Sequence, residues 1–140
     1  MSAEETKAVA QRWMDEVWQK ASPSAMNEIL ASDFTFNYAA PSVKPDREGY
    51  KQGVNDVHSG FPDVQFTTED MVVEGDKAAV YWKGRGTHKG QFWRIAPTGK
   101  QVTMAGISII RITGGKIVEE VGFLNMMGIM QELGAIPTSG

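Results

Sequence analysis

Few side chains in this sequence could carry out chemistry near neutral pH. The 140 residues include no cysteine, which excludes thiolate nucleophiles, disulfides and zinc–thiolate sites. Two histidines, His58 and His88, are too few for a multi-histidine metal site, so we expect no metal. His88 is a candidate proton acceptor, because an imidazole titrates near pH 7 without a large shift. The surrounding Gly-Thr-His-x-Gly run equally suits a histidine that closes a turn by bonding backbone carbonyls.

Charge and hydropathy exclude several classes of partner. The net charge is −3, and the 14 basic residues are scattered rather than clustered, so we expect no nucleic-acid partner. No apolar stretch approaches the ~20 residues of a membrane span. The first five residues are acidic and polar where a signal peptide would be basic and then apolar. These features predict a cytoplasmic protein that does not enter a membrane.

Helical patterns occupy the first sixty residues. Ser2 and Glu5 have the spacing of a capping box, and apolar residues then recur at helical spacing up to Ser22-Pro23. A short helix follows Pro23, and residues 33–38 alternate as a short strand. Asp46 can cap a further helix that ends near Gly60. We therefore expect three helices and one strand in this half of the chain.

Strand patterns dominate the rest of the chain. They cover residues 64–74, 77–88, 91–95, 101–113 and 116–125, and residues 126–133 form a last helix. Helices followed by an antiparallel sheet indicate an α+β fold, and with no linker or repeat we expect one domain over residues 1–140. Glycines within the strands predict a strongly curved sheet. Helices packed on its concave side would enclose a pocket, where small ligands usually bind.

Five segments, in this order and spacing, resemble the SnoaL-like polyketide cyclase (ester cyclase) family. They are Phe61-Pro62-Asp63, the run from Gly84 to Gly90, Pro97-Thr98-Gly99-Lys100, the run from Gly115 to Glu120, and Met130-Gln131-Glu132-Leu133-Gly134. The family shares its fold with ketosteroid isomerase and nuclear transport factor two. The resemblance implies a cone-shaped α+β barrel and a homodimer formed through an exposed sheet face. It also implies cofactor-free intramolecular aldol cyclisation of a hydrophobic, carbonyl-bearing small molecule.

The resemblance places the catalytic carboxylate at the position held here by Asn125. An amide cannot accept and return a proton near neutral pH, although it can donate and accept hydrogen bonds. Asn125 could point into the pocket and orient a carbonyl, or it could cap the helix that begins at Met126. We list Asn125 and His88 as the candidate catalytic residues and leave both interpretations of each open.

Strand alternation and the resemblance together suggest which side chains line the pocket. Asn125 shares a strand face with Val121 and Phe123, whereas Glu120 lies on the opposite face. For Trp82, Met104, Ser108 and Phe123, ordinary core packing is the alternative. The predicted substrate-binding residues are Asn37, Tyr38, Trp82, Met104, Ser108, Val121 and Phe123.

Three functions remain open on the sequence. The first is a cyclase or isomerase that uses acid–base chemistry on a hydrophobic ketone. The second is a non-catalytic binding or association domain that kept the pocket after losing the carboxylate. The third, an epoxide hydrolase, needs two aspartates beside an arginine, and neither Arg85 nor Arg111 has such partners in the sequence pattern.

Overall fold

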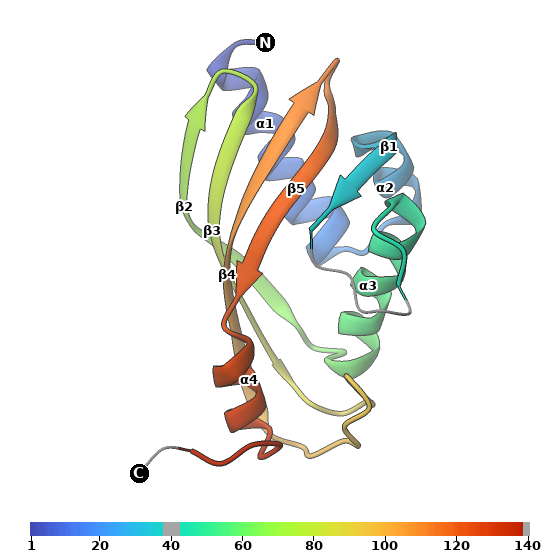
Figure 1. The fold of residues 1–140 in the computed structure, drawn as a ribbon, viewed down its shortest axis with the longest axis vertical. Coiled ribbons are helices and arrows are strands. Elements are labelled where there is room, and N and C mark those ends of the chain that lie inside the picture. Colours follow the sequence, from blue (N-terminus) through green and yellow to red (C-terminus); the bar gives the residue numbers. More distant parts are fainter. Residues whose placement is uncertain (38–42, 139–140) are drawn as a thin grey trace.

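The fold is an α+β arrangement of helices against one curved sheet (Figure 1). The computed structural model describes residues 1–37 and 43–138. No helix within these ranges is long and apolar enough to cross a membrane. The elements are α1 (Ala3–Arg12), η1 (Trp13–Gln19), α2 (Pro23–Ile29), β1 (Leu30–Phe36), α3 (Arg47–Gly60), β2 (Gln65–Glu74), β3 (Lys77–Thr87), β4 (Gln101–Thr113), β5 (Lys116–Leu124) and α4 (Met126–Glu132).

Side-chain caps define where the helices start. The Ser2 hydroxyl accepts a hydrogen bond from the Glu5 amide and begins α1. Ser22 caps α2 with Pro23 in its first turn, and the Asp46 carboxylate accepts from the Gly49 amide to cap α3. These side chains satisfy backbone N–H groups that lack a partner inside the helix. All three predicted helix starts are confirmed.

The first predicted helix changes geometry halfway along. After Arg12 the chain continues as η1, a π-helix of seven residues, instead of an α-helix up to Ser22. Ala21 follows in the left-handed region, with φ of 49°, and turns the chain toward α2. Nothing in the helical spacing of the apolar residues distinguishes these two geometries over so short a segment.

The five strands form one open sheet in the order β1-β5-β4-β3-β2. The pairs β2–β3, β3–β4 and β4–β5 are antiparallel, as predicted, whereas β1 pairs with β5 in parallel. The predicted strand over residues 91–95 is wrong. That segment has one isolated bridge between Phe92 and Ile95, closed by Trp93 and Arg94, both with positive φ.

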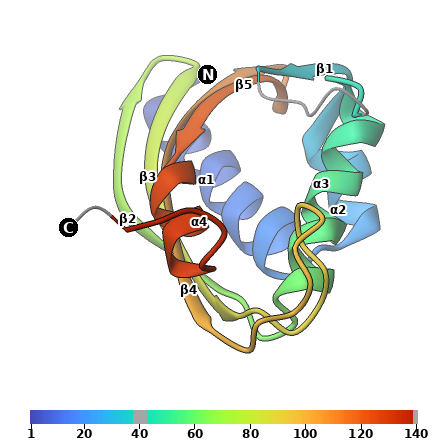
Figure 2. The ribbon, with the colours of Figure 1, turned by 60° about the horizontal axis from the view of Figure 1, so that its bottom comes forward.

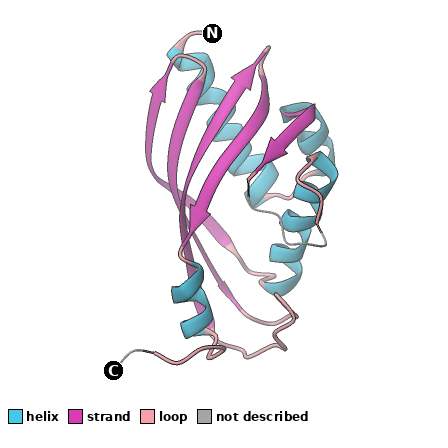
Figure 3. Cartoon of the chain, viewed as in Figure 1, coloured by secondary structure: helices cyan, strands magenta, loops and turns pink. Residues whose placement is uncertain are grey.

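The helices α1–α3 cover the concave side of the sheet, and Figure 2 shows α1 running along the inside of its curve. Figure 3 shows β2, β3, β4 and β5 running side by side, with β1 next to α2 and α3. The main core lies between the two layers and includes Trp13, Phe34, Tyr50 and Ile110. A second cluster, around Phe61, Phe92, Met104 and Ile129, fills the narrow end beside α4.

Candidate functional site

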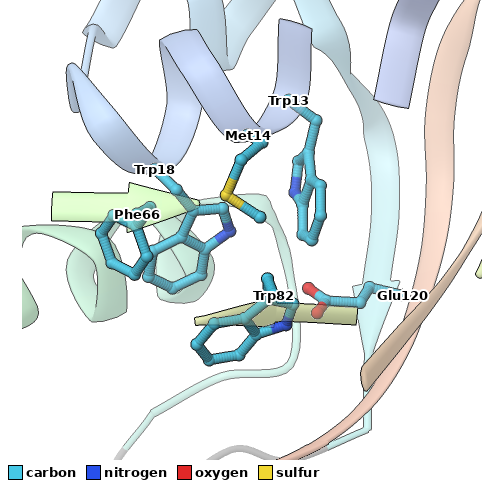
Figure 4. A pocket seen from close by; sticks show the side chains of 6 residues that line it. All are labelled: Trp13, Met14, Trp18, Phe66, Trp82 and Glu120. Atoms are coloured by element: carbon cyan, nitrogen blue, oxygen red, sulfur yellow. The ribbon is translucent and has the colours of Figure 1, made fainter. Parts of the chain in front are cut away.

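A small cavity lies between η1 and the concave face of the sheet (Figure 4). Its volume is about 10 Å³, which is room for roughly one water molecule. The walls are almost entirely apolar, and one carboxyl group points into the space. The lining residues are Trp13, Met14, Trp18, Phe66, Trp82 and Glu120.

Glu120 is the acidic side chain of this cavity and is 1% exposed. A bulge in β5 turns it inward: Arg111 pairs with Glu119 but Ile112 pairs with Ile117, so Val118 is an extra residue. An extra residue shifts the alternation of side chains by one position. Ile117 and Glu120 therefore both face the core, although they are three residues apart.

Ser108 on β4 holds one oxygen of this carboxyl. The Ser108 hydroxyl donates to Glu120 Oε2 at 2.6 Å and accepts from the indole N–H of Trp82 at 3.1 Å. Gly106, which pairs with Trp82, allows this arrangement. A Cβ on Gly106 would lie 2.6 Å from the Trp82 ring, so the indole can lie close against β4 only because this residue has no side chain.

Tyr50 on α3 approaches the carboxyl from the helical layer. Its hydroxyl oxygen accepts from the indole N–H groups of Trp13, at 3.0 Å, and Trp18, at 2.7 Å. The Tyr50 side chain also favours the charged form of Glu120 and so acts to lower its pKa. The other carboxyl oxygen of Glu120, Oε1, is buried, and none of the described residues forms a hydrogen bond with it.

Burial raises the pKa of Glu120 above its ordinary value, because a carboxylate loses its hydration in an apolar cavity. Hydrogen bonds from Ser108 and Tyr50 act in the opposite direction but do not cancel the effect of burial. A carboxyl group with a raised pKa is a stronger base when ionised and can carry a proton closer to neutral pH. The cavity therefore contains a group suited to moving a proton.

Two of the predicted substrate-binding residues lie at this cavity. Trp82 lines it, and Ser108 contacts its carboxyl group. Met104 is 3% exposed and belongs to the second core cluster near α4, which is the ordinary core packing considered as its alternative. Whether any of these residues binds a substrate stays a prediction.

The predicted inward orientation of Val121 and Phe123 is wrong. Both lie on the outer, convex face, and Phe123 is 74% exposed. Strict alternation from Ile117 would have turned them inward, but the bulge at Val118 reverses the faces from there on. They flank a shallow open groove of about 350 Å³ that also contains Tyr81, Ile107 and Asn125.

Asn125 therefore lies outside the cavity, and neither of its predicted roles matches its contacts. It occupies the position before α4 but makes no side-chain cap bond to that helix. Its Oδ1 instead accepts from the Ala105 amide at 2.8 Å, and its Nδ2 donates to the Thr103 carbonyl at 3.2 Å. These bonds continue the pairing of β4 with the chain beyond β5.

The Asn37 side chain lies at the end of β1 and is exposed. Its amide oxygen accepts from the Gly122 N–H and its amide nitrogen donates to the Gly122 carbonyl, so it extends the β1–β5 pairing. Asn37 is absent from the lining of the cavity. Tyr38, predicted beside it, lies outside the described residues.

His88 is fully buried in the narrow end of the fold and does not line the cavity. Its Nδ1 accepts from the Thr98 amide at 3.2 Å and lies 3.0 Å from the Thr98 hydroxyl. Its ring packs 5.4 Å from that of Phe61, centroid to centroid. The turn-closing role is the one its contacts support, although the partners are an amide and a hydroxyl rather than carbonyls.

The remaining polar candidates do not form a second catalytic set. Arg111 lies 3.7 Å from Glu119 on the exposed face, and Arg85 donates to Gln101. Asp63 accepts from the amide and hydroxyl of Thr87, and these bonds lower its pKa. Among residues 1–37 and 43–138, no three His, Cys, Asp or Glu side chains are grouped to hold a metal ion.

Comparisons with known proteins agree with this architecture. A family model described as SnoaL-like polyketide cyclase matches residues 8–133. Among solved structures, TsrD from Streptomyces laurentii has a TM-score of 0.86 at 21% identity, covering 97% of this chain and 99% of that chain. Wild-type IdmH from Streptomyces antibioticus has a TM-score of 0.76 at 26% identity, covering 96% and 99%. A SnoaL-like polyketide cyclase from Agrobacterium tumefaciens has a TM-score of 0.76 at 17% identity, covering 95% and 99%. A search of curated protein sequences finds no match.

Proposed function

This chain belongs to the SnoaL-like polyketide cyclase family, and we propose that it uses Glu120 to transfer a proton during cofactor-free cyclisation or isomerisation of a hydrophobic, carbonyl-bearing small molecule. The observation that carries the proposal is a single buried carboxyl group, with a raised pKa, inside an aromatic cavity. Aromatic walls suit a flat apolar ligand, and one polar group is enough to set its orientation.

The reaction needs only one group that accepts and returns a proton. Ionised Glu120 takes a proton from the carbon beside a carbonyl, which leaves neutral Glu120 and an enolate. In a cyclisation the enolate carbon bonds to a second carbonyl carbon of the same molecule, and the new alkoxide takes the proton back from Glu120. In an isomerisation, Glu120 returns the proton to a different carbon.

The cavity has to open before such a ligand can bind. A pocket for a drug-sized molecule has a volume of several hundred Å³, whereas this one is about 10 Å³. Met14, an unbranched side chain in the wall, is the lining residue that adapts most easily. Ligand binding in this proposal therefore includes a rearrangement of the lining side chains.

Deuterium exchange tests the proton transfer. A flat polycyclic ketone with deuterium beside the carbonyl is incubated with the protein, and loss of the label to water is followed by NMR. We expect the wild-type protein to accelerate the loss, and Glu120→Gln to reduce the rate by roughly 100-fold or more. Glu119→Gln, one residue away on the exposed part of the same strand, is the matched control and should exchange at the wild-type rate. Equal rates for Glu120→Gln and wild type would refute the proposal.

A non-catalytic binding domain is the second candidate. Its support is Asn125, which stands where the resemblance expects a carboxylate and whose side chain bonds the backbone of β4. Three tryptophans line the cavity, so a bound ketone should quench their fluorescence. Quenching by the ketone without any exchange in the wild-type protein would favour this second function.

A further inference from the structure

The polar groups around Glu120 form a network in which every bond is directed toward the carboxyl. Its outer members are the indoles of Trp13, Trp18 and Trp82, and an indole N–H can donate a hydrogen bond but cannot accept one. Each of these N–H groups ends on a hydroxyl oxygen, that of Tyr50 or that of Ser108, and the Ser108 hydroxyl in turn donates to Glu120. Because the indoles can only donate, each hydroxyl oxygen must accept from them, and the hydroxyl proton must point toward another acceptor.

The Tyr50 hydroxyl receives two of these bonds. With the N–H groups of Trp13 and Trp18 donating to its oxygen, its own proton must point away from both indoles. The Tyr50 side chain favours the charged form of Glu120. The Ser108 hydroxyl is in the same situation on the sheet side, because it accepts from Trp82 and donates to Oε2.

The π-helical geometry of η1 is what allows two tryptophans to share one hydroxyl. Trp13 and Trp18 are five residues apart. In an α-helix, at about 100° per residue, they would point roughly 140° apart around the axis. In a π-helix the bonds run between residues i and i+5, which brings these two residues closer together around the axis than in an α-helix. The unusual helix thus supports the donor pair.

We propose that Ser108 is a positioning residue for Glu120, and that the Trp82 indole orients the Ser108 hydroxyl proton so that Glu120 Oε2 is its acceptor. The proton that Glu120 carries in its neutral form then lies on Oε1, the oxygen without a complete hydrogen bond. The consequence for catalysis rests on the proposed function; the network itself does not. Burial, Ser108 and Tyr50 are the influences on the titration of Glu120, and of the two side chains only Tyr50 is itself titratable.

The test is a titration of the Glu120 carboxyl by carbon-13 NMR, with the signal assigned by its loss in Glu120→Gln. Ser108→Ala removes a donor to the charged form, so we expect the proton affinity of Glu120 to rise roughly tenfold. Trp82→Phe should also raise the proton affinity of Glu120, but by less. The Ser108 hydroxyl is still present in that variant, although no indole N–H orients it. Ser108→Thr keeps a hydroxyl and should restore the wild-type titration. Thr103→Ala, on the same strand, is the control and should leave it unchanged.

A lower proton affinity in Ser108→Ala would mean that neutral Glu120 donates to Ser108, and it would overturn the inference. So would an unchanged titration in Ser108→Ala and Trp82→Phe. No substrate takes part in this measurement, so its outcome is independent of the deuterium exchange assay. Exchange that depends on Glu120 together with an unchanged titration would keep the proposed function and remove the positioning network.

Discussion

Glu120 and Asn125 are five residues apart in the chain and lie on opposite sides of the sheet. The first is buried with its carboxyl in the cavity, and the second is exposed and bonds the backbone of β4. The resemblance to known cyclases drew attention to Asn125, where a carboxylate was expected. In this chain the acidic group of the cavity comes instead from the opposite face of β5.

The pH dependence of stability tests the burial of Glu120. Its pKa is raised in the folded state, so above the ordinary value of 4.5 the unfolded chain ionises this group more readily than the folded one does. The stability that Glu120 contributes in its neutral form is therefore present at low pH and lost as the pH rises through the folded-state value. We expect the Tm of Glu120→Gln minus that of wild type to increase from about pH 4.5 up to the folded-state pKa of Glu120 and then to level off. A difference independent of pH would contradict a raised pKa.

Asn125 should matter for stability and not for proton transfer. Asn125→Ala removes two side-chain bonds to the backbone of β4, which we expect to cost about 1–2 kcal/mol of unfolding free energy in urea. Asn55→Ala, on the exposed side of α3, should change it by less than about 0.5 kcal/mol. Deuterium exchange from the ketone should be the same in Asn125→Ala and wild type. A large loss of exchange would return Asn125 to the catalytic site.

For the helices and strands, the residues at their ends predicted the structure better than the alternation of side chains along the strands did. Ser2, Ser22 and Asp46 cap the helices that they were expected to cap, and the hairpin between β4 and β5 turns at Gly114-Gly115 as predicted. The bulge in β5 lies at Val118, and no glycine there signals an irregular strand. That single extra residue decides which face of β5 is inside, and it explains why Glu120 was missed.

One signal could have identified the inward face of β5. Ser108 is a polar residue on an otherwise apolar strand face, between Gly106 and Ile110. A buried hydroxyl needs a hydrogen-bond partner. On the neighbouring strand, Glu120 is the polar side chain that could supply it. The need for such a partner favours Glu120, rather than Val121 and Phe123, as the inward-facing side chain of β5.

The junction between η1 and α2 carries a strain that glycine would relieve. Ala21 has φ of 49°, a conformation that costs a residue with a Cβ about 1 kcal/mol. We expect Ala21→Gly to stabilise the protein by about 0.5–1 kcal/mol in urea unfolding. Ala8→Gly, the same change inside α1, should destabilise it by about 1 kcal/mol. If both variants lose stability, Ala21 does not adopt the left-handed conformation.

At the scale of the whole molecule, the sheet carries large apolar side chains on both faces. The inner face packs on the helices, and the outer face leaves large apolar side chains in solvent. These include Val72, Tyr81, Ile107, Ile109, Val121 and Phe123. An exposed apolar surface of this kind is typical of an interaction site. It also explains why hydrophobicity alone could not distinguish the inside of β5 from the outside.

We propose that two copies of the chain associate through this outer face, as the resemblance implies. Light scattering coupled to size-exclusion chromatography should then give the mass of a dimer. Phe123→Glu places a charge at the most exposed of these side chains and should shift the protein to monomer. Lys7→Glu, on the exposed side of α1, should leave the dimer intact. A wild-type protein that is monomeric at tens of micromolar would contradict the proposal.

The most direct test of the central claim is a crystal structure of the protein soaked with a flat polycyclic ketone. We predict that the ligand opens the cavity beneath η1, lies against Trp82 and places its carbonyl or the adjacent carbon within about 3 Å of the Glu120 carboxyl. Ligand found only in the outer groove, beside Phe123 and Asn125, with Glu120 still enclosed, would contradict it. In that case the chemistry would have to be sought on the other side of the sheet.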